Sequence, residues 1–312
     1  MDPVVTWVSR VAVAEGGLKS IIAALGANLG IAVSKFVAYL FTGSSSMLAE
    51  AVHSFADSSN QVLLLIGGRR AKRPPTAEHP FGYGRSRYVY AFLVAVVIFL
   101  AGGVFALFEA YEKFHSPTPV EDPAWAFGVL VVAIGLEGFS LRTALREAKP
   151  RRRGLSLPDF IRRTKTPEFA VVILEDFGAL CGLVLALVGV SVAVLTGDGR
   201  WDGVGSAAIG VLLVAIAVVL ATQVASLLVG EAADPTMENA VRAAIGDELI
   251  HLRTLHLGPD ELLVAAKIAV PAERAAGDVV DAIHATEEKI RAAVPYDCTI
   301  YLEPDLRRTP SF

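Results

Sequence analysis

Residues 49–61 read AEAVHSFADSSNQ, and the next seven residues, VLLLIGG, are typical of a membrane-spanning helix. A charged residue at the centre of such a helix costs about 2.5–3.5 kcal/mol. The stretch nevertheless carries Glu50, His53 and Asp57 within eight positions. Intramembrane ionisable groups are functional by default, so we expect the chain to use these side chains.

Helical periodicity places the polar residues of this stretch on one side of the helix. Glu50, His53, Asp57, Asn60 and Gln61 fall within an arc of about 100°. His53 and Asp57 are four residues apart and can therefore reach one atom. Imidazole with carboxylate suits Zn²⁺, and also Fe, Mn, Co or Ni. The alternative is a structural hydrogen bond between the two side chains.

The composition predicts a membrane protein. Of the 312 residues, 54% are hydrophobic, against about 45–50% in soluble domains. A spanning helix needs about 20 mostly apolar residues. Six segments qualify: residues 18–41, 46–68, 88–111, 125–145, 169–196 and 203–230. Residues 1–230 therefore form the expected six-helix transmembrane domain.

Lys and Arg are concentrated in two connections, residues 69–87 and 149–165, and the other connections carry few of them. Because basic loops stay in the cytoplasm, we expect both connections and both termini there. Nucleic-acid binding is the alternative, but both basic segments lie beside span ends, so we expect no nucleic-acid partner. Residues 1–20 resemble neither a signal peptide nor a transit peptide.

Residues 231–312 are mixed in composition and are expected to be a soluble cytoplasmic domain. Residues 235–247 and 278–294 have helical patterns. LRTLHL, the GPDE turn at 258–261 and LLVAAKIAV predict a hairpin, and CTIYLEP predicts a third strand. The order αββαβ indicates a small two-layer, ferredoxin-like domain. The fold class is therefore mainly α, with this α/β domain at the end.

The fifth and fourth spans also carry acids. VVILEDFGALCG contains Glu175 and Asp176, which as neighbours point about 100° apart. Either could instead be protonated or paired with a base. Gly178 and Gly182 in the same segment favour a close helix contact, as do the glycines of the third and sixth spans. Glu137 in the fourth span is expected to be structural or to carry protons.

Together these residues resemble the cation diffusion facilitator family of zinc transporters. Three motifs carry the resemblance: SSSMLAEAVHSFADSSNQ in the second span, HPFGYGR at residues 79–85 and VILED in the fifth span. In combination they resemble most the branch that contains the animal mitochondrial zinc exporter. The resemblance covers almost the whole chain and implies a homodimer with one transport site per protomer.

The resemblance also implies ligands. His53 and Asp57 match the pair of the second span, and Asp176 matches the second ligand of the fifth span. The first ligand of that span falls on Val172, which cannot bind metal. The fourth position then needs one of several groups: water, Glu175, Asn60 or Glu50.

Two further positions depart from the family pattern. In the loop motif, His79 has Tyr83 and Thr76 where other ligands would stand, so we expect it to cap or pack the loop rather than bind metal. In the C-terminal domain, Lys267 stands among the positions where metal ligands would be expected, so we expect that domain to fold without metal.

The expected function is export of a divalent cation by proton antiport with alternating access. Zn²⁺ is the favoured substrate, with Mn²⁺, Fe²⁺ or Co²⁺ as alternatives, and neither an organic cofactor nor enzyme activity is expected. His53 would exchange protons, since an unperturbed imidazole has a pKa of about 6.5. The expected location is a bacterial inner membrane. The alternative is a membrane-bound metal sensor or scaffold that does not transport.

Overall fold

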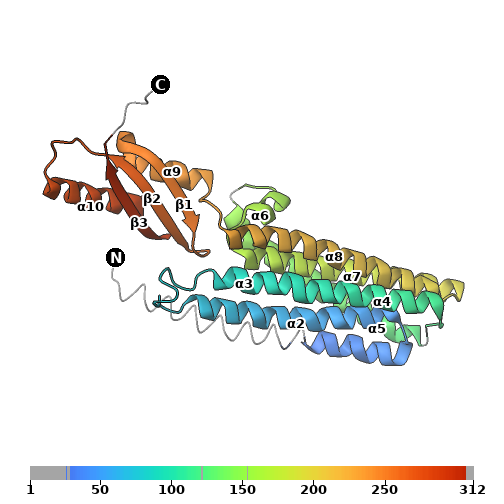
Figure 1. Cartoon of the computed structure of the whole chain (residues 1–312). Helices are drawn as coiled ribbons and strands as arrows, with labels where there is room; N and C mark the ends of the chain where they lie inside the picture. Colours follow the sequence, from blue (N-terminus) through green and yellow to red (C-terminus); the bar gives the residue numbers. More distant parts are fainter. Residues whose placement is uncertain (1–25, 27–28, 121, 153, 307–312) are drawn as a thin grey trace, which may run out of the picture. The chain divides into compact units, whose positions relative to one another are not determined.

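The computed structural model describes residues 26, 29–120, 122–152 and 154–306 (Figure 1). The chain forms two compact units, which we describe separately. The helical unit comprises the chain up to Leu65, Ala91–Thr164 and Glu168–Ala221. The second unit comprises Ile66–Tyr90, Lys165–Pro167 and the chain from Thr222 onward.

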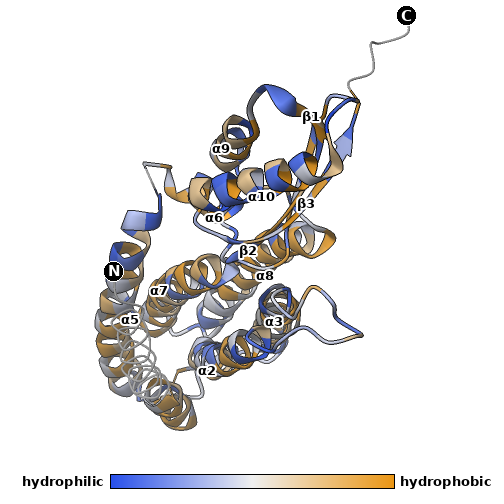
Figure 2. Cartoon of the chain, turned by 90° about the vertical axis from the view of Figure 1, so that its left-hand side faces the viewer, coloured by the Kyte–Doolittle hydropathy of each residue, from blue (hydrophilic) through white to orange (hydrophobic). Residues whose placement is uncertain are grey.

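Helices make up most of the chain. Before the C-terminal elements they are α2 (Ser45–Ala71), α3 (Ser86–Leu93), a π-helical turn (Val94–Phe99), α4 (Leu100–His115), α5 (Pro123–Arg152), α6 (Leu157–Arg163), α7 (Pro167–Thr196) and α8 (Arg200–Val229). A further apolar helix covers Leu29–Thr42. Figure 2 shows hydrophobic residues along most of these helices.

Four helical segments within the described residues are long and apolar enough to cross a membrane: Ser86–His115, Pro123–Arg152, Pro167–Thr196 and Arg200–Val229. They coincide with the third to sixth segments expected from the sequence. The second expected span is α2, which has 27 residues but whose polar side chains lower its hydropathy. The first expected span lies partly outside the described residues, and its described part is Leu29–Thr42.

Glycines allow α4 and α8 to touch through their backbones. A Cβ added at Gly103 would lie 3.0 Å from the carbonyl oxygen of Gly210, and one at Gly210 would lie 2.8 Å from that of Gly103. Any side chain at either position would push the helices apart. The close packing expected from the glycines of these two spans is therefore confirmed.

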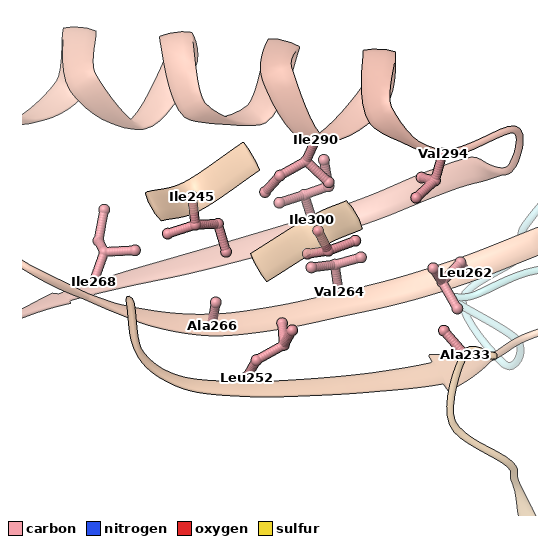
Figure 3. Close-up of a cluster of buried hydrophobic side chains, with 11 residues drawn as sticks. Ala233, Ile245, Leu252, Leu262, Val264, Ala266, Ile268, Ile290, Val294 and Ile300 are labelled. Carbon is pink, nitrogen blue, oxygen red and sulfur yellow. The ribbon is translucent and has the colours of Figure 1, made fainter. Parts of the chain in front are cut away.

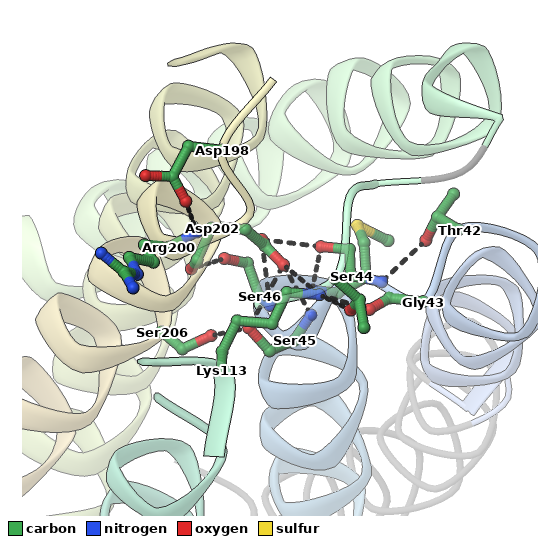
Figure 4. Close-up of polar contacts among 12 residues, drawn as sticks. Thr42, Gly43, Ser44, Ser45, Ser46, Lys113, Asp198, Arg200, Asp202 and Ser206 are labelled. Carbon is green, nitrogen blue, oxygen red and sulfur yellow. Dashed lines mark hydrogen bonds and ion pairs between the residues drawn. The ribbon is translucent and has the colours of Figure 1, made fainter. Parts of the chain in front are cut away.

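A buried cluster fixes the start of α2 (Figure 4). The Asp202 carboxylate, from the first turn of α8, accepts hydrogen bonds from Ser44 Oγ at 2.8 Å, Ser45 N at 2.7 Å and Ser46 N at 3.3 Å. Lys113 Nζ of α4 lies 3.8 Å from Asp202 and donates to the Gly43 carbonyl at 3.0 Å. Asp202 thus satisfies the free N–H groups of the helix start and complements its dipole.

The C-terminal elements follow the expected order. They are α9 (Pro235–Ile245), a 3₁₀ turn (Gly246–Glu248), β1 (Leu249–His256), β2 (Glu261–Ala269), α10 (Ala276–Ala293) and β3 (Asp297–Asp305). The sheet order is β1-β2-β3, with β1 antiparallel and β3 parallel to β2. The helix–strand–strand–helix–strand order is confirmed.

The core of this sheet comes from alternation along β2. Leu262, Val264, Ala266 and Ile268 are buried, and the intervening residues are less so. They pack with residues of α9, α10 and β3, including Ile290 (Figure 3). One face of the sheet is thus covered by helices, as the period-2 pattern requires.

We predict that Asp202→Ala lowers the free energy of unfolding by about 3–5 kcal/mol, because it leaves the first N–H groups of α2 without their acceptor and the buried Lys113 without its counter-ion. Thermal unfolding of the detergent-solubilised protein measures the loss. The matched control is Asp198→Ala, which removes only the acceptor of the Arg200 N–H at 3.0 Å and should cost about 1 kcal/mol. Equal losses in both variants would contradict the role given to Asp202.

Candidate cation site

The polar residues of α2 share one buried face. Glu50, His53, Asp57 and Asn60 are each at most 5% exposed, because their spacing of three or four residues places them on one side of the helix. His53 Nδ1 lies 3.5 Å from Asp57 Oδ1. The pair expected from the sequence therefore does lie together, inside the helical unit. We call these four residues the polar face of α2.

The two acids of α7 are buried and point to different neighbours. Glu175 lies near the Asn60 amide of α2, although no hydrogen bond of normal geometry joins them among the described residues. Asp176 instead accepts a hydrogen bond from Ser140 Oγ of α5 at 3.1 Å. In this conformation Glu175 is directed at α2 and Asp176 at α5.

The carboxyl group of Glu137 interacts electrostatically with the acids of both α2 and α7. It is half-buried on α5 and interacts with the charges of Glu50 and Asp57 on α2 and of both acids on α7. Three helices therefore direct carboxyl groups into one region. Since like charges in a low-dielectric interior repel strongly, this region needs cations or protons.

Several polar atoms of this region are buried and complete no hydrogen bond with any described residue. They are Glu50 Oε1, both amide atoms of Asn60, Gln61 Oε1 and Glu175 Oε2. Buried polar groups in folded proteins nearly always have partners. Because most of these atoms are oxygens that accept only, a cation, a proton or water suits them.

No three His, Cys, Asp or Glu side chains lie close enough to hold a metal within the part of the chain that the structure describes. His53, Asp57 and Asp176 are thus not gathered around one point in this conformation. Val172, one helical turn before Asp176, is half-buried and offers no ligand atom.

Sequence reasoning missed Lys35. It lies in helix Leu29–Thr42 and is fully buried. Its Nζ donates to Glu50 Oε2 at 3.0 Å and to Ser54 Oγ at 2.7 Å. The signal was present in the sequence: a lysine inside the apolar run IAVSKFVAYL needs a partner in the membrane.

The loop histidine His79 is exposed and packs within its own loop. Its ring lies edge-on to Tyr83, with 4.5 Å between the ring centroids. Its backbone exchanges two hydrogen bonds with Thr76, at 3.1 Å each. These contacts are those of a residue that packs the loop.

The C-terminal positions have protein partners. Lys267 Nζ lies 2.9 Å from Glu303 Oε1 and 3.6 Å from Asp305 Oδ2. His256 is buried, with its ring edge-on to Tyr296 and Nδ1 3.3 Å from the Gly258 carbonyl. Burial lowers the pKa of His256, although this hydrogen bond opposes the effect. A neutral imidazole is therefore favoured there.

Gly182 of α7 lies against the Glu50 carboxylate, because a Cβ at this position would overlap Glu50 Oε1. We predict that Gly182→Ala lowers the free energy of unfolding by about 1–3 kcal/mol, the cost of overpacking. Gly138→Ala on α5, which has no atom within 4 Å of the added Cβ, should be neutral or stabilising by up to about 1 kcal/mol. Thermal unfolding of both variants compares them, and a stable Gly182→Ala would contradict this contact.

Comparison with known proteins identifies the family of the helical segment. Residues 21–229 match the cation efflux transmembrane domain. The proton-coupled zinc antiporter SLC30A9, mitochondrial, of Xenopus laevis is 34% identical over 203 residues, which are 64% of this chain and 36% of that protein. Metal tolerance protein C4 of Arabidopsis thaliana is 29% identical over 257 residues, 80% of this chain and 56% of that protein.

A bacterial relative matches a shorter region. The zinc transporter ZitB of Escherichia coli is 28% identical over 124 residues, 40% of this chain and 37% of that protein. The chain therefore matches between about a third and just over half of the length of these relatives. Because the cation efflux domain covers 21–229, and thus more than half of the 312 residues, the chain belongs to the cation efflux family.

Proposed function

We propose that the chain is a secondary active transporter that exports a divalent cation, Zn²⁺ before Mn²⁺, Fe²⁺ or Co²⁺, in exchange for protons. One observation carries the proposal. The buried polar face of α2 meets the acids of α7 in a region where Glu50, Asn60 and Glu175 keep atoms without a hydrogen bond to any described residue. A transported cation or proton provides the missing partner.

Coupling follows from shared ligands. A metal ion needs neutral imidazole and ionised carboxylate, so binding releases protons and protonation releases the metal. We assign metal binding to His53, Asp57 and Asp176, with His53 as the group that exchanges protons. Glu175, Asn60 or Glu50 completes the set or supports it, and Glu137 carries protons or neutralises charge.

Alternating access would gather and separate these ligands. His53 and Asp57 lie on α2, whereas Asp176 is held by Ser140 of α5 in this conformation. A rotation of α7 relative to α2 that breaks this hydrogen bond would bring Asp176 toward His53 and Asp57. Exchange of Zn²⁺ for protons agrees with the names of the relatives, which include a proton-coupled zinc antiporter and a zinc transporter.

We propose the same architecture as the sequence predicts. Six spans, including the helix that contains Leu29–Thr42 and α2, form a transport domain of residues 1–230. Residues 231–312 form a ferredoxin-like cytoplasmic domain that supports a homodimer. The basic connections favour cytoplasmic termini, and we propose a bacterial inner membrane as the location.

In vesicles that contain the purified protein and a trapped zinc-sensitive dye, we predict that His53→Ala and Asp176→Ala each reduce Zn²⁺ flux to below about a tenth, since even outer partners of metal ligands change affinity 10–100-fold. A trapped pH dye should report proton counterflow with the unaltered chain and none with either variant. His79→Ala, at the exposed loop position, is the matched histidine control and should transport normally.

Each outcome is informative. Full flux in either site variant would overturn the site, and flux without proton movement would overturn antiport. Zn²⁺ binding that needs His53 in a chain that moves no metal would favour a sensor or scaffold instead.

We also predict that Val172→His tightens Zn²⁺ binding by about 10–100-fold, because it adds an imidazole one turn from Asp176 on the same helix face. Equilibrium binding of Zn²⁺ and Mn²⁺ to the detergent-solubilised protein measures it, with Val171→His, on a neighbouring position of α7, as the control. Unchanged Zn²⁺ affinity would contradict a site on this face of α7.

A further inference from the structure

Lys35 brings a positive charge into the helical unit at the candidate site. Its side chain is 0% exposed, and so is that of its partner Glu50. The Nζ–Oε2 distance is 3.0 Å, and a second hydrogen bond of 2.7 Å reaches Ser54 Oγ. A fully buried ammonium ion with two close acceptors is held firmly, because breaking a buried ion pair costs about 3–5 kcal/mol.

The pair lies beside the residues to which we assign metal binding. Glu50 lies three residues before His53, and Ser54 directly follows His53. Lys35 therefore binds α2 on both sides of His53, a proposed metal ligand. The charge of Lys35 acts on His53, Asp57 and Glu137 as well as on Glu50. Lys35 therefore contributes to the electrostatic potential at each of these side chains.

The region has many more acids than bases. Five carboxyl groups interact there: Glu50, Asp57, Glu137, Glu175 and Asp176. Within the described residues, Lys35 is the one lysine or arginine whose charge acts on Glu50, Asp57 and Glu137. A fixed positive charge is thus built into a site that otherwise attracts cations.

Lys35 uses one oxygen of Glu50. The other, Oε1, completes no hydrogen bond with a described residue and lies against Gly182 of α7. Glu50 is therefore at the interface between the two helices that carry the proposed ligands, with an oxygen that could bind metal. Lys35 and Gly182 together fix where that oxygen points.

We infer that Lys35 is a selectivity-determining residue, a tethered cation that holds Glu50 out of the metal's ligand set. This inference rests on the proposed function. With Glu50 held, the set stays mixed, with imidazole and few carboxylates, which suits Zn²⁺. With Glu50 released, one more hard oxygen ligand enters, and oxygen-rich sets suit Mn²⁺.

The test compares Zn²⁺ and Mn²⁺ dissociation constants by equilibrium binding to the detergent-solubilised full chain. Lys35→Met should bind both ions more tightly and Mn²⁺ by about 10–100-fold, so that the preference for Zn²⁺ over Mn²⁺ falls. Adding Glu50→Gln should restore the preference, because the released carboxylate is then gone. Lys35→Arg should keep it, because a guanidinium can also pair with Glu50.

Lys35→Gln guards against misfolding, since it removes the positive charge that holds Glu50 but keeps a polar group that can hydrogen-bond Ser54. It should shift the preference in the same direction. Lys113→Met is the matched control, because it removes another buried lysine that bonds Gly43 and Thr118, and it should leave the preference unchanged.

The inference would be overturned if Lys35→Gln left the preference for Zn²⁺ over Mn²⁺ unchanged. It would also be overturned if this preference fell equally in Lys35→Met and in Lys35→Met with Glu50→Gln. His53→Ala separates this failure from that of the proposed function. If His53→Ala abolishes Zn²⁺ binding while the Lys35 variants bind like the unaltered chain, the site stands and the inference fails. If His53→Ala binds normally, the proposed site itself fails.

Discussion

Charge burial is the constraint on which the helical unit depends. Glu50, His53 and Asp57 are carried by α2 at a depth where an isolated charge costs several kcal/mol. The helix is stable there because other helices supply partners: Lys35 for Glu50 and Asp202 for the helix start. Buried oxygens of Glu50, Asn60 and Glu175 have no hydrogen-bond partner among the described residues. This excess of acceptors over donors makes the region suitable for a cation.

Two buried lysines, Lys113 and Lys35, each pair with a buried carboxylate at a different place in the helical unit. Lys113 stabilises the start of α2 together with Asp202, next to backbone carbonyls and serine hydroxyls. Lys35 pairs with Glu50, the first residue of the polar face. The first interaction anchors a helix end, whereas the second changes the charge of the site itself.

The α/β domain is stabilised mainly by apolar packing rather than by buried ion pairs. Its stability comes from apolar alternation along β2 packed beneath two helices, and its surface lysine, Lys267, is paired with Glu303 and Asp305. A domain whose charged residues pair with each other folds on burial of apolar area. We therefore expect metal to act on the helical unit rather than on this fold.

By itself the sequence determined the elements and the polar face of α2. Hydropathy predicts the long helices, and periods of 3.6 and 2 predict the polar face and the C-terminal order, because both are local properties of the chain. Only the tertiary structure decided the partners. Three contacts join residues distant in sequence: Asp202 with the start of α2, Ser140 with Asp176, and Lys35 with Glu50. No local pattern encodes which helix faces meet.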